Sequence, residues 1–346
     1  MTREPHPAEP LRVAVIGAGS WGTTLADLLA RKGHRVTLWA REPEVAEGIR
    51  TTGRNPFFLP DHDLCRTLHV VTELEAALEE ADLGLLAIPS SHLRAVIHPV
   101  RQRLSALPLL VNAAKGLETG TGARLSQVIL EELGVQEGSS ADRLAVLSGP
   151  NLAGEIAGGK ISACVVASPH PSIGMRLQEV FSTPTFRAYR HTDRCGVELG
   201  GTLKNIFAIG AGIVDGLGLG DNAKAAYLTR SLHEMVRLGT RLGGRISTFY
   251  GLSGLGDLMA TAASPLSRNH QLGQALARGE ADAHRLLHGR MVIEGVATTR
   301  MALEWGKKLT IPLPITEEIS RVLFDRLSPR EAARNLMTRS LKDEEE

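Results

Sequence analysis

The 346-residue sequence has few cysteines, no excess of charge of one sign and no long apolar run. Its three cysteines, Cys65, Cys164 and Cys195, form no Cys-x-x-Cys pair, and an odd number suits a disulfide framework poorly. A reducing, cytoplasmic compartment is therefore expected. The 39 Lys and Arg residues nearly balance the 38 Asp and Glu residues, which leaves a formal net charge of +1. No nucleic-acid partner is expected, and any anion-binding site must be local.

No stretch approaches the roughly 18 apolar residues of a membrane-spanning helix, so no stable membrane insertion is expected. Residues 1–10 hold three prolines and no apolar run, which argues against a signal or transit peptide and predicts a disordered extension. The histidines are scattered, and no His/Cys spacing fits zinc, so no metal site is predicted. Residues 341–346 are expected to form an acidic tail.

The length predicts about two domains, and 43% hydrophobic residues are enough for a sizeable core. Residues 11–191 alternate short apolar runs with helical patterns such as 20–31, which is typical of an α/β domain with a buried parallel sheet. The expected strands are 11–16, 35–39, 68–71, 83–88, 109–112, 144–147, 162–167 and 185–189.

Strand-like runs largely disappear between residues 192 and 340, where Ala- and Leu-rich stretches indicate an all-α second domain. Glycine-rich joints are expected at 215–221 and 251–256. The expected helices are 197–214, 222–242, 271–277, 296–307 and 317–324.

The segment Gly17-Ala18-Gly19-Ser20-Trp21-Gly22 matches Gly-x-Gly-x-x-Gly between an expected strand and an expected helix. In that context Gly17 permits a tight turn, Gly19 lets the backbone approach a pyrophosphate, and Gly22 lets the helix pack on the strand. The N–H groups at the start of the helix then face the phosphates. The sequence therefore predicts a dinucleotide-binding, Rossmann-like domain.

Arg41 follows the second expected strand, 19 positions after Gly22. A guanidinium there suits the 2′-phosphate of NADP(H). Glu42 is adjacent and suits the ribose hydroxyl of NAD(H) instead. Arg41 could also be an ordinary surface arginine, so both NADPH and NADH stay open as cofactors.

Two further segments follow expected strands, where ligands of α/β proteins bind. Lys115 could contact the substrate or its phosphate, or it could be a solvated lysine. Ser148-Gly149-Pro150-Asn151 could face nicotinamide or substrate, or it could only begin a helix.

The helical half contains a second set of polar candidates. Lys204 and Asn205 precede the apolar run 206–212. Burial would lower the pKa of a lysine and suit it to proton transfer, although a lysine at a helix edge can also extend into water. Asp257 could hold a lysine ammonium or simply cap a helix. Ser267, Arg268 and Asn269 could form a phosphate clamp, or they could be only a capped helix start with a surface arginine. Glu294 could accept from a ribose or amide group, or it could simply favour the N-terminus of a helix.

These motifs, in this order from about residue 11 to 339, resemble the bacterial-type NAD(P)-dependent glycerol-3-phosphate dehydrogenases. The resemblance implies a Rossmann-like domain followed by a helical domain of the 6-phosphogluconate dehydrogenase type. The matching motifs are Gly17 to Gly22, Lys115 to Glu118, Ser148 to Pro150, Glu198 to Asn205, Gly216 to Lys224, Gly251 to Asp257, Ser264 to Asn269, and Glu294-Gly295.

The resemblance implies NAD(P)H-dependent reduction of dihydroxyacetone phosphate to sn-glycerol 3-phosphate, which feeds glycerophospholipid synthesis, and it is compatible with a homodimer. It makes Lys204 the catalytic proton donor and acceptor and has Lys115 shared between cofactor and substrate. The implied substrate-binding residues are Gly149, Asp257, Ser267, Arg268 and Asn269. The implied cofactor-binding residues are Ser20, Trp21, Arg41, Ala153, Arg268 and Glu294.

The sequence departs from the family pattern at two places. Asn151 stands where Ser or Thr is usual; it keeps a donor and an acceptor and stays a candidate substrate ligand. Leu152 replaces an aromatic ring, and Glu42 follows Arg41 where a second basic residue is common. Two alternatives stay open: another two-domain Rossmann hydroxyacid dehydrogenase, for which His233-Glu234 would be the pair to consider, and a nucleotide sensor without turnover.

Overall fold

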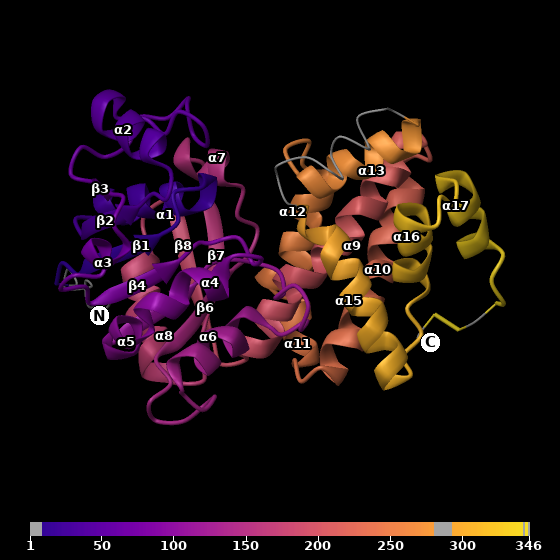
Figure 1. Ribbon diagram of the computed structural model, residues 1–346. Coiled ribbons are helices and arrows are strands. Elements are labelled where there is room, and N and C mark those ends of the chain that lie inside the picture. Colours follow the sequence, from indigo (N-terminus) through magenta and orange to yellow (C-terminus); the bar gives the residue numbers. More distant parts are fainter. Residues whose placement is uncertain (1–8, 280–292, 342, 345–346) are drawn as a thin grey trace, which may run out of the picture. The chain divides into compact units, whose positions relative to one another are not determined.

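The computed structural model describes residues 9–279, 293–341 and 343–344. The chain divides into two compact units, residues 1–198 and 199–346, which we describe one at a time (Figure 1). The division falls a few residues after the expected boundary near residue 192. It lies within the long helix that begins at Arg194.

The first unit is built on an eight-stranded sheet with the order β3-β2-β1-β4-β5-β6-β7-β8. Neighbouring strands are parallel except β6 and β7, which are antiparallel. The strands are β1 (Arg12–Ile16), β2 (Arg35–Trp39), β3 (His69–Val71), β4 (Leu83–Leu86), β5 (Leu109–Asn112), β6 (Leu144–Ser148), β7 (Ser162–Ala167) and β8 (Phe186–His191).

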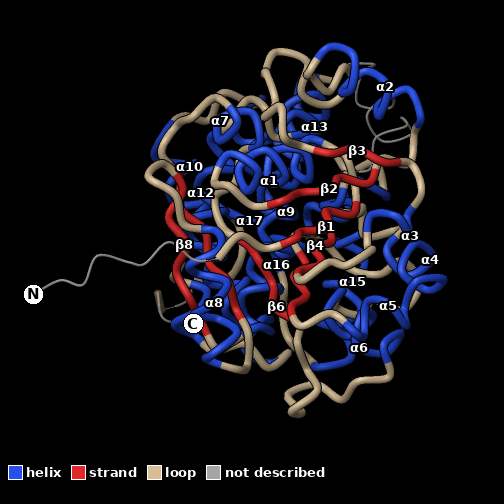
Figure 2. Tube along the Cα trace, turned by 90° about the vertical axis from the view of Figure 1, so that its left-hand side faces the viewer, coloured by secondary structure: helices blue, strands red, loops and turns tan. Residues whose placement is uncertain are grey.

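Helices cover both faces of this sheet (Figure 2). Alternate residues of β1 explain why: Val13 and Val15 pack into one apolar cluster, Ala14 and Ile16 into another. The first cluster includes α1 (Ser20–Arg31), α2 (Pro43–Thr52), α7 (Ala153–Ala157) and α8 (Pro171–Phe181). The second includes α3 (Leu74–Ala77), α4 (Leu93–Ile97), η1 (His98–Val100), α5 (Arg101–Ala106) and α6 (Leu125–Leu133).

The order of the strands reverses beside β1, because β2 and β3 lie on one side of it and β4 on the other. Ligands of open α/β sheets bind at the carboxyl ends of the strands at this reversal. The first unit is thus a Rossmann-like domain, as the sequence predicted.

The second unit is helical in its described residues. Its elements are α9 (Arg194–Gly216), whose first residues belong to the first unit, α10 (Asp221–Arg241), α11 (Ile246–Phe249), the π-helical turn η2 (Leu252–Gly256), α12 (Asp257–Ala263), α13 (Arg268–Arg278), α15 (Glu294–Leu309), α16 (Pro314–Phe324) and α17 (Pro329–Met337).

Small residues bring α9 and α13 close together. A Cβ on Gly212 would overlap the carbonyl oxygen of His270, and a Cβ on Gly273 would overlap that of Ile209. Any larger residue would force the two backbones apart. This close approach fixes Asn205 on α9 near Asn269 on α13.

Some predictions need correction. The 23-residue helix α9 is long and apolar enough to cross a membrane by length and composition, so the expectation that no stretch comes near that limit was wrong. Its apolar stretch is fully buried, as in the core helix of a globular domain. Residues 252–256 are helical rather than a joint, and α17 was not predicted. The expected extension lies outside the described residues except for residues 9 and 10, and the expected acidic tail is described only at residues 341, 343 and 344.

Candidate functional site

The glycine-rich turn after β1 is shaped by close packing at two of its three glycines. Gly17 has a φ of +116°, and a Cβ there would lie 2.6 Å from the carbonyl oxygen of Ala87. A Cβ on Gly22 would overlap the carbonyl oxygen of Gly17. A Cβ on Gly19, in contrast, would have no atom of the described residues within 4 Å. Of the three glycines, the middle one is therefore the one beside which the described part of the chain leaves open space.

That open space lies at the N-terminus of α1, where Gly19 is the N-cap residue and provides no side-chain cap. The N–H groups of the first turn and the positive end of the helix dipole favour an anion here. The side chain of Ser20 donates to the carbonyl of Phe58 at 2.8 Å. The buried Nε1 of Trp21 has no hydrogen-bond partner among the described residues, so it can donate to a ligand.

Arg41 follows the carboxyl end of β2, and its side chain is 62% exposed. Its Nη2 lies 2.6 Å from Oε1 of Glu42, and its Nε donates to the same oxygen at 3.0 Å. The neighbouring carboxylate therefore engages the guanidinium. A 2′-phosphate at this point would compete with Glu42 for Arg41.

The segments after β5 and β6 meet through Lys115, whose Nζ donates to the carbonyl oxygen of Gly149 at 3.0 Å. Gly149 has a φ of +137°, and a Cβ there would lie 3.1 Å from the carbonyl oxygen of Ala163. Any other residue at that position would be strained. The turn thus holds Lys115 at the edge of the sheet where ligands are expected.

Asn151 follows this turn, and its Oδ1 and Nδ2 are both buried without a partner among the described residues. A buried amide group without hydrogen bonds lowers the stability of the fold. Two such atoms on Asn151 therefore indicate a place for a ligand or for water. Ala153 begins α7, and its carbonyl oxygen accepts a hydrogen bond from Thr24 of α1 at 3.3 Å. The segment after β6 therefore contacts the helix that begins at the glycine-rich turn.

Lys204 lies in the middle of α9 and is only 7% exposed. Its Nζ donates to Oδ1 of Asp257 at 2.9 Å and to Oγ1 of Thr261 at 2.5 Å, and Thr261 donates to Asp257 at 3.2 Å. Asp257 and Thr261 occupy one face of α12 and are themselves buried. The structure thus favours a buried, partnered lysine over one that extends into water.

Asn205, the next residue along α9, connects three helices by hydrogen bonds. Its Oδ1 accepts from Nδ2 of Asn269 at 3.0 Å, and its Nδ2 donates to Oε2 of Glu294 at 3.1 Å. The backbone N–H of Gly295 donates to Oδ1 of Asn269 at 3.1 Å. Residues from α9, α13 and the start of α15 therefore meet at one point.

The phosphate-clamp candidates surround the beginning of α13. Ser267 is the N-cap residue, and its Oγ accepts from the backbone N–H of His270 at 3.3 Å. Arg268 is exposed and makes no ion pair with any described residue. An exposed guanidinium beside the first turn of an 11-residue helix is suited to an oxyanion.

Two residues of these sites were missed by the sequence analysis. Asn55 is fully buried; its Nδ2 donates to the carbonyl oxygen of Ala18 and to Oγ1 of Thr23, so it braces the glycine-rich turn. Thr261 lies four residues after Asp257. That helical i, i+4 spacing could have indicated it, whereas nothing local points to Asn55.

Glu234, from the His233-Glu234 pair considered for another dehydrogenase, is held in a structural contact. The carboxylate of Glu234 is buried and accepts hydrogen bonds from the N–H groups of Ile315 and Thr316, each at 2.9 Å. Burial raises its pKa, and the hydrogen bond from the Thr316 hydroxyl opposes that rise. Glu234 therefore caps the first turn of α16.

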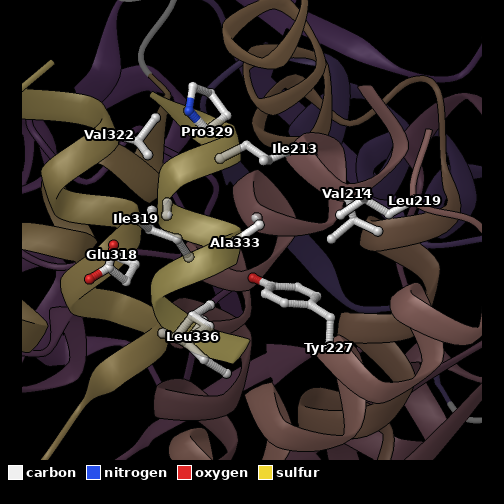
Figure 3. Close-up of a pocket in the computed structure, with 13 residues that line it drawn as sticks. Ile213, Val214, Leu219, Tyr227, Glu318, Ile319, Val322, Pro329, Ala333 and Leu336 are labelled. Carbon is white, nitrogen blue, oxygen red and sulfur yellow. The ribbon is translucent and has the colours of Figure 1, made fainter. Parts of the chain in front are cut away.

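An apolar cavity of about 50 Å³ lies in the second unit between α9, α10, α16 and α17 (Figure 3). Aliphatic side chains form most of its wall, and Tyr227 directs its hydroxyl to the carbonyl oxygen of Phe207 at 2.9 Å. None of the candidate site residues lines it. The cavity is therefore separate from the candidate site residues.

Comparison with known proteins places both units in one family. Residues 12–173 match the profile described as the N-terminus of NAD-dependent glycerol-3-phosphate dehydrogenase, and residues 193–334 match the profile of its C-terminus.

Individual relatives agree with these profiles. The chain is 45% identical over 334 residues to glycerol-3-phosphate dehydrogenase [NAD(P)+] of Nitratidesulfovibrio vulgaris, covering 96% of this chain and 100% of that protein. It is 47% identical over 312 residues to the enzyme of Moorella thermoacetica, covering 90% and 91%. The crystal structure of glycerol-3-phosphate dehydrogenase from Coxiella burnetii superposes with a TM-score of 0.88 at 37% identity, covering 95% of this chain and 99% of that one.

Proposed function

The chain belongs to the NAD-dependent glycerol-3-phosphate dehydrogenase family, and we propose that it catalyses the NAD(P)H-dependent, reversible reduction of dihydroxyacetone phosphate to sn-glycerol 3-phosphate. The observation that carries the proposal is the buried Lys204, hydrogen-bonded to Asp257 and Thr261 and adjacent to Asn205. A proton donor and one amide side chain thus lie next to each other on α9, and Asn269 of α13 contacts that amide. Reduction of a ketone requires a proton for the developing alkoxide, and the polar neighbours can orient the substrate.

The residues present fit a dinucleotide. The open space at Gly19 and the N–H groups of α1 suit the pyrophosphate, and the orphaned Trp21 Nε1 supplies a further donor. Gly17 and Gly22 shape this turn, with Ser20 in its first helical position. Lys115, Ala153, Arg268 and Glu294 are further proposed contacts. The bound nicotinamide supplies the hydride that the ketone carbon accepts.

Lys204 is the proposed general acid. Its ammonium gives a proton to the carbonyl oxygen as negative charge develops there, and in the reverse direction its amine takes that proton back. Asp257 and Thr261 hold Nζ in one position, so little reorganisation is needed at the moment of transfer. Lys115, Asn151 and Asn205 are proposed to orient the substrate and to stabilise its oxygen atoms.

The phosphate of the substrate is proposed to bind at the start of α13. Arg268 provides a charged fork, Ser267 and Asn269 provide short polar side chains, and the N–H groups of the first turn face the anion. Binding energy from the phosphate, which does not react, positions the ketone for transfer. Gly149, whose carbonyl oxygen holds Lys115, is a further proposed substrate contact.

Arg41 is proposed to accept the 2′-phosphate of NADPH, with Glu42 as the competing partner that keeps NADH usable. The first unit would bind the cofactor, and the second would supply Lys204 and the phosphate site. We further propose a cytoplasmic enzyme that supplies glycerophospholipid synthesis and forms a homodimer. The cytoplasmic location is supported by Cys65, Cys164 and Cys195, which form no disulfide within the described residues.

The proposal is tested by following NADPH and NADH oxidation by the purified protein with dihydroxyacetone phosphate, and with unphosphorylated dihydroxyacetone beside it. Turnover that depends on the phosphate is expected, with detection of sn-glycerol 3-phosphate as product. Equal turnover of both ketones would contradict the proposed phosphate-binding site. Cofactor binding without turnover of either would support a sensor.

A further inference from the structure

The hydrogen bonds around Asn205 form a closed cycle. The N–H of Gly295 donates to Oδ1 of Asn269, Nδ2 of Asn269 donates to Oδ1 of Asn205, and Nδ2 of Asn205 donates to Oε2 of Glu294. All three heavy-atom distances are between 3.0 and 3.1 Å. Because Glu294 and Gly295 are neighbours in the chain, the cycle closes through the first two residues of α15.

The chemistry of the two ends gives this cycle a single direction. A backbone N–H can only donate a hydrogen bond, and an ionised carboxylate can only accept one. Asn269 must therefore turn its oxygen to Gly295 and its NH₂ to Asn205. Asn205 must in turn present its oxygen to Asn269 and its NH₂ to Glu294. Neither amide can rotate by half a turn without losing hydrogen bonds.

Packing keeps the cycle tight. Asn205 is 3% exposed and Asn269 is 9% exposed, so an unpaired amide here would be costly. A Cβ on residue 295 would lie 2.6 Å from Oδ1 of Asn269 and 2.7 Å from the carbonyl oxygen of Asn205, so only glycine lets this N–H approach. Each Nδ2 carries a second N–H that the cycle does not use.

We infer that Glu294 is a positioning residue for the phosphorylated substrate, because its carboxylate, together with the backbone N–H of Gly295, fixes the direction in which Asn205 and Asn269 present their remaining N–H groups. The inference rests on the proposed function, in which these two residues contact the substrate. It gives Glu294 a role that a contact with the cofactor alone would not require.

The first test separates the two roles of Glu294 kinetically. In Glu294→Ala the Nδ2 of Asn205 loses its acceptor, and the KM for dihydroxyacetone phosphate at saturating NADPH should rise on the order of tenfold, with a smaller change in kcat. Glu304→Gln, on the exposed part of the same helix, is the matched control and should leave both values unchanged. A raised NADPH Kd with an unchanged KM for the ketone would overturn the inference.

The second test exchanges the two ends of one hydrogen bond. Asn205→Asp alone would bring two carboxylates together at the 3.1 Å contact and lower the melting temperature. Adding Glu294→Gln restores a donor, because in the double variant N205D/E294Q the glutamine amide donates to the carboxylate at position 205. The double variant keeps the wild-type net charge. It should melt above N205D, with its KM still raised because the side chain at position 205 then has no N–H.

A double variant no more stable than N205D would show that the cycle does not form. These melting temperatures do not depend on the reaction. If the wild-type protein fails to reduce dihydroxyacetone phosphate, the proposed function fails and the positioning role falls with it, while the melting temperatures still report whether the cycle exists.

Discussion

The three glycines of the turn after β1 should respond differently to the same added methyl group. In Gly19→Ala the new Cβ would meet no atom within 4 Å in the described part of the chain, and the backbone at this N-cap position has φ −69° and ψ 177°, which alanine adopts freely. In Gly22→Ala the Cβ would overlap the carbonyl oxygen of Gly17. Gly19→Ala therefore tests the space proposed for the ligand, and Gly22→Ala tests the packing of α1 on the turn.

These contacts determine how much each substitution should change the unfolding free energy. Replacing glycine with alanine at an N-cap costs roughly 0.5–1 kcal/mol, and the lower entropy of the unfolded chain returns about 0.4–1 kcal/mol. The unfolding free energy of Gly19→Ala should therefore stay within about 1 kcal/mol of wild type. Gly22→Ala requires the backbones of α1 and the turn to separate and should lose about 3 kcal/mol or more.

The affinity for NADPH, in contrast to the stability, should be more sensitive to Gly19→Ala than to Gly22→Ala. The methyl of Gly19→Ala occupies the space proposed for the pyrophosphate, so NADPH should bind at least about tenfold more weakly, or about 1.4 kcal/mol. The assays are urea unfolding and titration of NADPH fluorescence on the same preparations. Wild-type NADPH affinity in a folded Gly19→Ala protein would refute the placement of the cofactor. Wild-type stability in Gly22→Ala would refute the packing argument.

Three other predictions concern side chains of the first unit. Glu42→Gln removes the charged partner of Arg41 and should raise the ratio of kcat/KM for NADPH to that for NADH up to about fivefold. An unchanged ratio would show that Arg41 does not bind the 2′-phosphate. Burial raises the pKa of Cys195 to about 11 and that of the buried Cys164 further, so a thiol reagent at pH 8 should label Cys65 first and Cys164 last, and fast labelling of Cys164 would contradict its burial. The hydrogen bond from Arg94 holds the pKa of Glu118 below its usual range. The pair therefore stabilises the fold above pH ~4.3, and this stabilisation is lost as the pH falls through the lowered pKa. Arg94→Met should have a lower unfolding free energy in urea than wild type at pH 7, and the difference between the two proteins should become smaller in acid.

Local signals in the sequence account for most of the first unit. The strands 35–39, 109–112 and 162–167 and the helix 20–31 have the predicted bounds, because strands buried on both faces are continuous apolar runs. The antiparallel orientation of β7 left no such signal. Nothing in its residues distinguishes an antiparallel strand from a parallel one when both faces are covered.

Glycine was the main source of error in the second unit. Three glycines between 251 and 256 indicated a joint, yet η2 occupies these residues. A Cβ on Gly254 would overlap the carbonyl oxygen of Phe249, and one on Gly200 would lie 2.9 Å from that of Ser253. These glycines serve the close packing of helices rather than the freedom of a loop, and sequence alone does not separate the two uses.

The motifs located the individual candidates but not their connections. Lys204 and Asp257 are 53 residues apart, and Asn205 and Glu294 are 89 residues apart, so no local spacing predicts their hydrogen bonds. For the same reason, Asn55 could not be associated with the glycine-rich turn 37 residues earlier.

The most direct test of the central claim is the rate of NADPH oxidation with saturating dihydroxyacetone phosphate in wild type and Lys204→Ala, with NADPH affinity measured on both. The loss of a general acid should slow turnover on the order of 10²–10⁴-fold while NADPH still binds. Turnover near the wild-type rate in a folded, cofactor-binding Lys204→Ala protein would contradict the assignment of Lys204 as the proton donor.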